Sequence, residues 1–123
     1  MMDLEFDDKM PIYLQIMDRI KMDIVTERLK PKDKLPSIRD MAMNLKVNPN
    51  TLQRAYQELE RLGIVYTQRG MGTFVGERDN MVDELKQEMA KEVMDAFILR
   101  MKHLGFTEQE MMKSISKKII EVK

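Results

Sequence analysis

The chain contains no cysteine and no tryptophan, and only one of its 123 residues is histidine. The absence of cysteine excludes disulfides, thiolate zinc sites and cysteine nucleophiles. A single histidine, His103, argues strongly against a histidine-based metal site or a Ser-His-Asp triad. No apolar run approaches the roughly 20 residues that a membrane-spanning helix requires. We therefore expect a protein without a metal or cofactor and without a membrane segment.

The N-terminal residues also lack the basic start and apolar core of a signal peptide, since positions 3–8 are mostly acidic. We accordingly expect the protein in the cytoplasm. Hydrophobic residues make up 43% and charged residues 34% of the chain, which is typical of a folded, soluble protein rather than a disordered one. The length suits one ordinary domain, or a small domain with an appendage.

Charge is balanced overall but unevenly distributed along the chain. Lysine and arginine together number 21, as do aspartate and glutamate. Between Arg28 and Arg69, however, nine basic side chains oppose four acidic ones, while acids gather at 3–8 and 79–95. A basic middle between acidic flanks indicates a polyanionic partner such as nucleic acid. Solvated lysines on helix faces would explain the same pattern.

Hydrophobic periodicity and capping residues predict three helices in the first half of the chain. Isoleucines at i+4 steps, beginning at Ile12, predict an amphipathic helix over residues 11–27, with proline in its first turn. Ser37 is a good N-cap for a short helix that we expect to end near residue 45. Asn48 followed by proline predicts a third helix to about residue 62. Its expected inward residues are Leu52, Ala55, Tyr56, Leu59 and Leu62.

The second half begins with strand composition and ends in long helical patterns. Residues 64–75 read as a β-hairpin around a turn with two glycines. Helical periodicity then extends over about residues 80–104, and Thr107 with Glu110 forms a capping box for a last helix. The predicted fold class is mostly α with a small β-hairpin: a winged helix-turn-helix domain over residues 1–76 and a two-helix region over 77–123.

Two short helices joined by a tight turn, the second begun by Asn-Pro, are typical of a helix-turn-helix, and the following hairpin of its wing. In this motif the second helix lies in the DNA major groove with its N-terminal residues near base edges. Asparagine and glutamine can pair with adenine there, and arginine with guanine. The candidate residues are Asn48, Asn50, Thr51, Gln53 and Arg54. A helical hairpin with a merely solvated polar side is the alternative.

A set of linked stretches carries a family resemblance over more than half of the chain. In order, they are Pro11-Ile12-Tyr13-Leu14-Gln15-Ile16, Leu35-Pro36-Ser37-Ile38-Arg39-Asp40-Met41-Ala42, Val47-Asn48-Pro49-Asn50-Thr51-Leu52-Gln53-Arg54-Ala55-Tyr56-Gln57-Glu58-Leu59-Glu60, Gly63-Ile64-Val65 and Arg69-Gly70-Met71-Gly72-Thr73-Phe74-Val75. Residues 11–75 thereby resemble the DNA-binding domain of the GntR family of bacterial transcription regulators.

The resemblance implies roles for individual positions. Arg39 matches a family arginine that contacts DNA, and Arg69 with Gly70 matches a wing tip that approaches the minor groove. Ser37 is first a helix cap, and its hydroxyl could also meet a phosphate. Some family members have arginine where this chain has Pro49 and Gln53. Readout by this chain must therefore rest more heavily on its amide side chains and on the arginine that follows.

The short C-terminal region resembles that of the YtrA-like subfamily, in which it serves dimerisation. The sequence agrees independently, because a lone pair of amphipathic helices cannot bury both of its apolar stripes. The alternative is that these stripes fold back on the chain's own first domain. The candidate interface residues are Val82, Leu85, Met89, Val93, Phe97, Met112, Ile115 and Ile119.

We expect a homodimeric, sequence-specific regulator, a repressor, that binds double-stranded DNA at a pseudo-palindromic operator. No effector is identified by the sequence. The competing hypothesis is a non-enzymatic winged-helix module that binds protein. An enzyme is disfavoured, because the chain has no Gly-rich phosphate loop, nucleophile–base pair or metal cluster.

Overall fold

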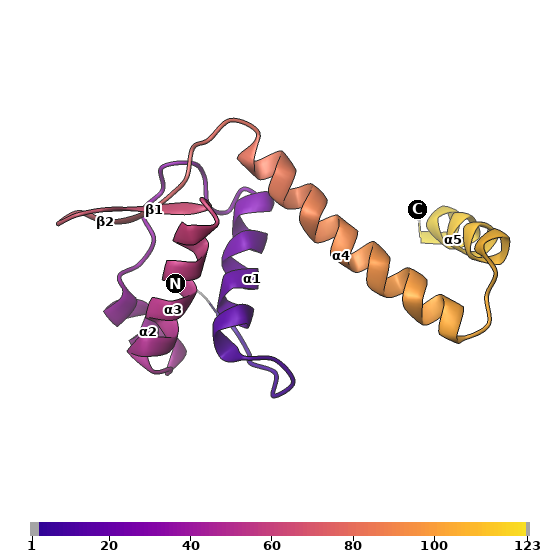
Figure 1. Ribbon diagram of the computed structural model, residues 1–123, viewed down its shortest axis with the longest axis horizontal. Coiled ribbons are helices and arrows are strands. Elements are labelled where there is room, and N and C mark those ends of the chain that lie inside the picture. The colour runs from indigo at the N-terminus through magenta and orange to yellow at the C-terminus, as the bar shows by residue number, and fades with distance from the viewer. Residues whose placement is uncertain (1–2, 123) are drawn as a thin grey trace. The chain divides into compact units, whose positions relative to one another are not determined.

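The computed structural model describes residues 3–122, which form five helices and one two-stranded sheet (Figure 1). This confirms the predicted class of a mainly α chain with a small β-hairpin. The chain divides into two compact units, the first ending at Leu85 and the second beginning at Lys86. In order, the elements are α1 (Ile12–Val25), α2 (Ile38–Leu45), α3 (Pro49–Arg61), β1 (Val65–Gln68), β2 (Gly72–Val75), α4 (Met81–His103) and α5 (Glu108–Val122).

The core of the first unit lies where α3 packs against α1 and α2 (Figure 1). Each large aliphatic side chain removed from water here stabilises the fold by about 1.5–3 kcal/mol before entropy is counted. Leu52 and Leu59 of α3 are fully buried, as are the isoleucines of α1 at positions 16 and 20. The buried side of α3 leaves its opposite side open to solvent.

Side-chain caps define the turn between α2 and α3. The Ser37 hydroxyl accepts a hydrogen bond of 3.0 Å from the Asp40 backbone N–H, and the Asn48 side-chain oxygen accepts one of 2.8 Å from the Asn50 N–H. Between the helices, Lys46 adopts a left-handed conformation with φ of 58°. The predicted caps are confirmed, and α3 begins at a fixed place.

Tyr56 ties α3 to the segment that precedes α2. Its hydroxyl donates a hydrogen bond of 2.7 Å to the Pro36 carbonyl, and the ring is buried. Burial raises the pKa of Tyr56, so the hydroxyl keeps the proton that it donates. The expected packing role of Tyr56 is thus joined by a polar one.

The hairpin forms as predicted, and an earlier segment of the chain also pairs with β2. β1 and β2 are antiparallel, with Gln68 opposite Gly72 at the tip. The segment over residues 32–35 then bonds to β2: Val75 donates to the Asp33 carbonyl at 2.8 Å, and Leu35 donates to the Thr73 carbonyl at 2.8 Å. The sequence indicated only a polar turn followed by an extended residue here.

Two predicted inward residues prove to be exposed. Ile12 is 40% exposed because it is the first residue of α1, at the end of the apolar stripe. Leu62 is 44% exposed because α3 ends at Arg61, where the chain turns toward β1 instead of continuing over the core. Helical periodicity identifies a face, but it does not say where along the helix the core stops.

The first unit extends beyond Gly76, after which we had expected the domain boundary. Gly76 is buried, and a Cβ atom built there would lie 3.1 Å from the Met81 sulfur. Met81 and Leu85, in the first turns of α4, are 2% and 4% exposed. These turns of α4 therefore complete the core of the first unit.

The second unit contains the rest of α4 and all of α5. The predicted capping box at the start of α5 is confirmed: Thr107 N–H donates to Glu110 Oε1 at 2.9 Å, and Glu110 N–H donates to Thr107 Oγ1 at 3.1 Å. The hydrogen bond from the Thr107 backbone N–H lowers the pKa of Glu110. None of the helices within residues 3–122 combines the length and apolar character of a membrane-spanning helix.

Candidate nucleic-acid interface

The solvent side of α3 carries a row of polar side chains. Asn50, Gln53, Arg54 and Gln57 are all exposed and stand at i, i+3, i+4 and i+7, which places them on one helix face. Their amide and guanidinium groups are the side chains best suited to hydrogen-bond base edges. Gln57 was not among the predicted residues, although its spacing from Asn50 was available as a signal.

The other two candidates, Asn48 just before α3 and Thr51 in its first turn, are less available for contact. Asn48 uses its side-chain oxygen as the helix cap, and Thr51 is half-buried. Pro49 has no N–H, and the N–H groups of Asn50 and Thr51 donate to Asn48, so none of these three positions offers an N–H to an anion. Of the predicted residues at this helix, Asn50, Gln53 and Arg54 are therefore the ones with exposed side chains that do not cap it.

Arg54 is held by a residue of α1. Its guanidinium carbon lies 3.9 Å from the centre of the Tyr13 ring, and its Nη2 atom donates a hydrogen bond of 3.2 Å to the Tyr13 hydroxyl. This is a cation–π contact reinforced by a hydrogen bond. Sequence reasoning did not identify this contact, because no local signal pairs two residues 41 positions apart.

Arg39 is exposed in the first turn of α2. The alternative to DNA contact is an ion pair of Arg39 with Asp40 or Glu58, but Glu58 pairs with Arg61 at 2.8 Å. Within the described chain, residues 3–122, Arg39 forms no ion pair of 4.0 Å or less. Its charge is therefore not neutralised by a neighbouring carboxylate.

The wing presents a second basic group beside the predicted one. Arg69 and Gly70 are exposed in the turn between β1 and β2, where Gly70 has a φ of +80° that favours glycine. A Cβ atom at Gly72 would lie 2.7 Å from Lys34 Cε, so the Lys34 side chain crosses the hairpin close to its tip. Lys34 was not predicted as a site residue.

Substitution of Ser37 should separate its two suggested roles. Ser37→Ala removes the cap and should lower the free energy of unfolding by about 1 kcal/mol. Ser37→Asp keeps a good cap but adds a negative charge, so it should preserve stability and weaken DNA binding if a phosphate lies near. Urea titration and DNA titration of both variants provide the two readouts. Unchanged DNA binding by Ser37→Asp would leave Ser37 with the cap alone.

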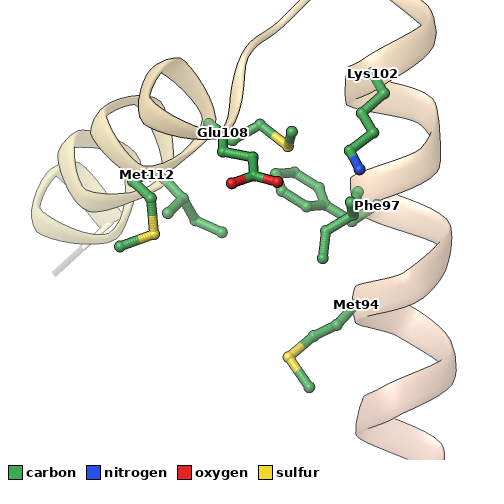
Figure 2. Close-up of a pocket in the computed structure, with 8 residues that line it drawn as sticks. Met94, Phe97, Lys102, Glu108 and Met112 are labelled. Carbon is green, nitrogen blue, oxygen red and sulfur yellow. The ribbon is translucent and has the colours of Figure 1, made fainter.

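The second unit exposes an apolar surface as well as charged side chains. A groove of about 570 Å³ lies between α4 and α5 (Figure 2). Figure 2 shows Phe97 and Met94 of α4 facing Met112 of α5 across this groove, with Glu108 and Lys102 at one end. The residues that line it are Met94, Phe97, Ile98, Lys102, Glu108, Met111, Met112 and Ile115.

The predicted interface residues are placed unequally. Val93 and Met112 are 70% and 68% exposed, and Phe97, Ile115 and Ile119 are exposed as well. Val82 and Met89 are half-buried. Leu85, by contrast, is buried within the first unit, so we assign it to that core and not to an interface. Within residues 3–122, no cluster of three or more histidine or acidic side chains could hold a metal ion.

Comparison with known proteins supports this description of the fold. The model of the "Bacterial regulatory proteins, gntR family" matches residues 12–75. The chain is 54% identical to YhcF of Bacillus subtilis, described as an uncharacterized HTH-type transcriptional regulator, over 93% of this chain and 94% of that protein. It is 38% identical to the HTH-type transcriptional repressor YtrA of the same organism, over 92% and 88% of the two chains.

The chain is also similar in three-dimensional structure to a solved protein. The GntR family transcriptional regulator from Listeria monocytogenes superimposes with a TM-score of 0.83 at 41% sequence identity, covering 91% of this chain and 98% of that one. The matched family region spans α1 to β2, which is the winged helix-turn-helix described above. The chain therefore belongs to the gntR family of bacterial regulatory proteins, which are DNA-binding transcription regulators.

Proposed function

We propose that the chain is a homodimeric transcriptional repressor that reads its operator with α3 in the major groove and the β1–β2 wing at the adjacent minor groove. The observation that carries this proposal is the exposed row on α3, whose side chains can pair with base edges. An α-helix is about 10–12 Å across and the major groove about 12 Å wide, so α3 would fill the groove.

The surroundings of α3 suit this arrangement. Arg39, which lacks an ion-pair partner within residues 3–122, offers a charge to the DNA backbone next to α3. At the wing, Arg69 and Lys34 supply positive charge that suits the electronegative minor groove. Gly70 allows the hairpin tip to approach DNA closely because it has no side chain.

A second copy of the chain is the partner that we infer for the apolar surface of the second unit. α5 buries only Met111 among its described residues, while Met112, Ile115 and Ile119 face solvent. Contiguous apolar surface of this kind marks an interaction site. Pairing of two such units would bury these side chains and bring two α3 helices to one DNA.

The form of the operator and the direction of regulation follow from this arrangement. A two-fold dimer binds a pseudo-palindromic site whose half-sites are separated by whole turns of the DNA. Repression is inferred from the similarity to YtrA, which is named a repressor. Such a function would place the chain in the cytoplasm with the bacterial chromosome.

Selection of duplexes from a random DNA pool by the full chain, at near-physiological salt, tests the proposal. We expect enrichment of one inverted repeat, bound by two chains. Insertion of five base pairs between the half-sites of that repeat is the matched control, because half a helical turn moves one half-site to the opposite face of the DNA. A folded, dimeric chain that enriches no sequence would contradict sequence-specific binding and favour a protein partner.

Substitution of the amide side chains should alter sequence preference, not general affinity. Asn50→Ala and Gln53→Ala should each relax the preference at one base pair per half-site, which corresponds to about 1–3 kcal/mol of lost discrimination. The duplex selection is repeated with each variant, and the base frequencies at each position of the selected repeat measure the change in preference. Glu60→Ala, an exposed change farther along α3, should leave the selected sequence unchanged. An identical selected repeat for the Asn50 and Gln53 variants would remove both residues from the readout.

A further inference from the structure

The contact between Tyr13 and Arg54 joins the first turn of α1 to the edge of the exposed face of α3. The guanidinium lies over the ring at 3.9 Å, and Arg54 Nη2 donates to the Tyr13 hydroxyl at 3.2 Å. Arg54 is exposed and Tyr13 half-buried, so both polar groups reach solvent at the same place. The Tyr13–Arg54 pair therefore borders the proposed base-reading surface on the side of α1.

The hydrogen-bonding capacity of this pair is mostly unused. The Tyr13 hydroxyl accepts from Arg54, which leaves its own proton free to be donated elsewhere. Stacking on the ring leaves the in-plane N–H donors of the guanidinium accessible. Among residues 3–122, neither side chain makes a further hydrogen bond. Donors that converge in this way match the oxygens of a phosphate group.

The position of the pair selects the part of DNA that it would meet. A helix that fills the major groove directs its central exposed side chains at base edges and its flanks at the walls of the groove, which are the sugar–phosphate backbones. Arg54 stands at the edge of the row, and its guanidinium lies over the Tyr13 ring of α1. Reaching a base would require Arg54 to leave the ring.

We propose that Tyr13 and Arg54 together bind one backbone phosphate of the operator, the tyrosine hydroxyl and the guanidinium donating to oxygens of the same group. This rests on the proposed placement of α3 in the major groove. It assigns Tyr13 to the DNA interface, and it makes Arg54 a residue that positions the protein on the backbone instead of one that reads sequence.

The test compares Tyr13→Phe and Arg54→Gln with the unaltered chain on two probes: the most enriched duplex from the selection and a scrambled duplex of equal length. Dissociation constants are measured over a range of KCl concentrations. Tyr13→Phe keeps the ring and should weaken binding to both probes by about two- to tenfold, the effect of one lost hydrogen bond. Arg54→Gln should lower the slope of log affinity against log salt by about 0.9 per chain, the effect of one lost phosphate contact.

Two further variants sharpen the interpretation. Arg54→Lys keeps the charge but loses the planar donors, so it should weaken binding while leaving the salt slope near that of the unaltered chain. The combined Tyr13→Phe and Arg54→Gln variant should bind little more weakly than Arg54→Gln, because both changes remove parts of one contact. The base preference of every variant should equal that of the unaltered chain, since a phosphate carries no sequence information.

The following results would overturn the proposal. An Arg54→Gln chain with changed preference at one base pair would make Arg54 a base reader. A Tyr13→Phe chain with unaltered affinity would remove the hydroxyl from the interface. An equal fall in slope for Arg61→Gln, which lies on the same helix but pairs with Glu58, would show an effect of net charge alone. If the unaltered chain bound both probes equally, the proposed function would fail with it. If the unaltered chain preferred the selected duplex and the variants had the same affinities and salt slopes as the unaltered chain, only the phosphate site would be refuted.

Discussion

A chain that carries Phe97→Glu and Ile115→Glu is expected to be a monomer and to bind its operator at least 100-fold more weakly than the unaltered chain. Both residues line the groove between α4 and α5, and they are 37% and 39% exposed. In a dimer they would be covered, and a carboxylate buried there without a partner is strongly unfavourable. Loss of the dimer removes the gain from linked half-sites, which is typically 10²–10⁴ in affinity.

The measurement combines sedimentation equilibrium with titration of the selected duplex. Ser114→Glu is the matched control: it adds the same charge to α5 at an exposed position on the side that carries Lys117, Lys118 and Glu121, and should leave both the dimer and the affinity intact. Circular dichroism establishes that α4 and α5 remain helical in the variant. A glutamate variant that stays dimeric with native affinity would place the interface elsewhere on the chain.

The second large effect is expected in stability. Leu52→Ala should lower the free energy of unfolding by about 3 kcal/mol, because it removes a fully buried side chain and leaves a cavity beneath the start of α3. For a unit of this size the midpoint of thermal unfolding should fall by roughly 10–20 °C. DNA binding should weaken as well, since Leu52 anchors the turn of α3 that carries Asn50 and Gln53.

Leu62→Ala is the matched control in the same segment. Leu62 was also predicted to face inward, but at 44% exposure its truncation should cost less than about 1 kcal/mol. Urea unfolding of both variants gives the comparison. Similar losses for the two leucines would contradict the assignment of Leu62 to the surface.

The sequence by itself determined the elements and their ends. Ser37, Asn48 and Thr107 form the predicted caps, because a cap depends on hydrogen bonds between residues two or three positions apart. The polar row on α3 followed in the same way from helical spacing, so Asn50 and Gln53 could be chosen without a structure. Family resemblance extended this local reading to Arg39 and to the wing, and the family match over residues 12–75 confirmed the resemblance.

Only the tertiary structure determined which residues far apart in the chain come into contact. It joined residues 32–35 to β2, moved Leu85 from the expected interface into the first core, and brought Tyr13 to Arg54. Each of these contacts links positions far apart in the chain, and hydrophobic periodicity is the same whether a stripe meets its own domain or another surface. Periodicity and capping depend on a few neighbouring residues, whereas the partner of each face depends on the packing of the whole chain.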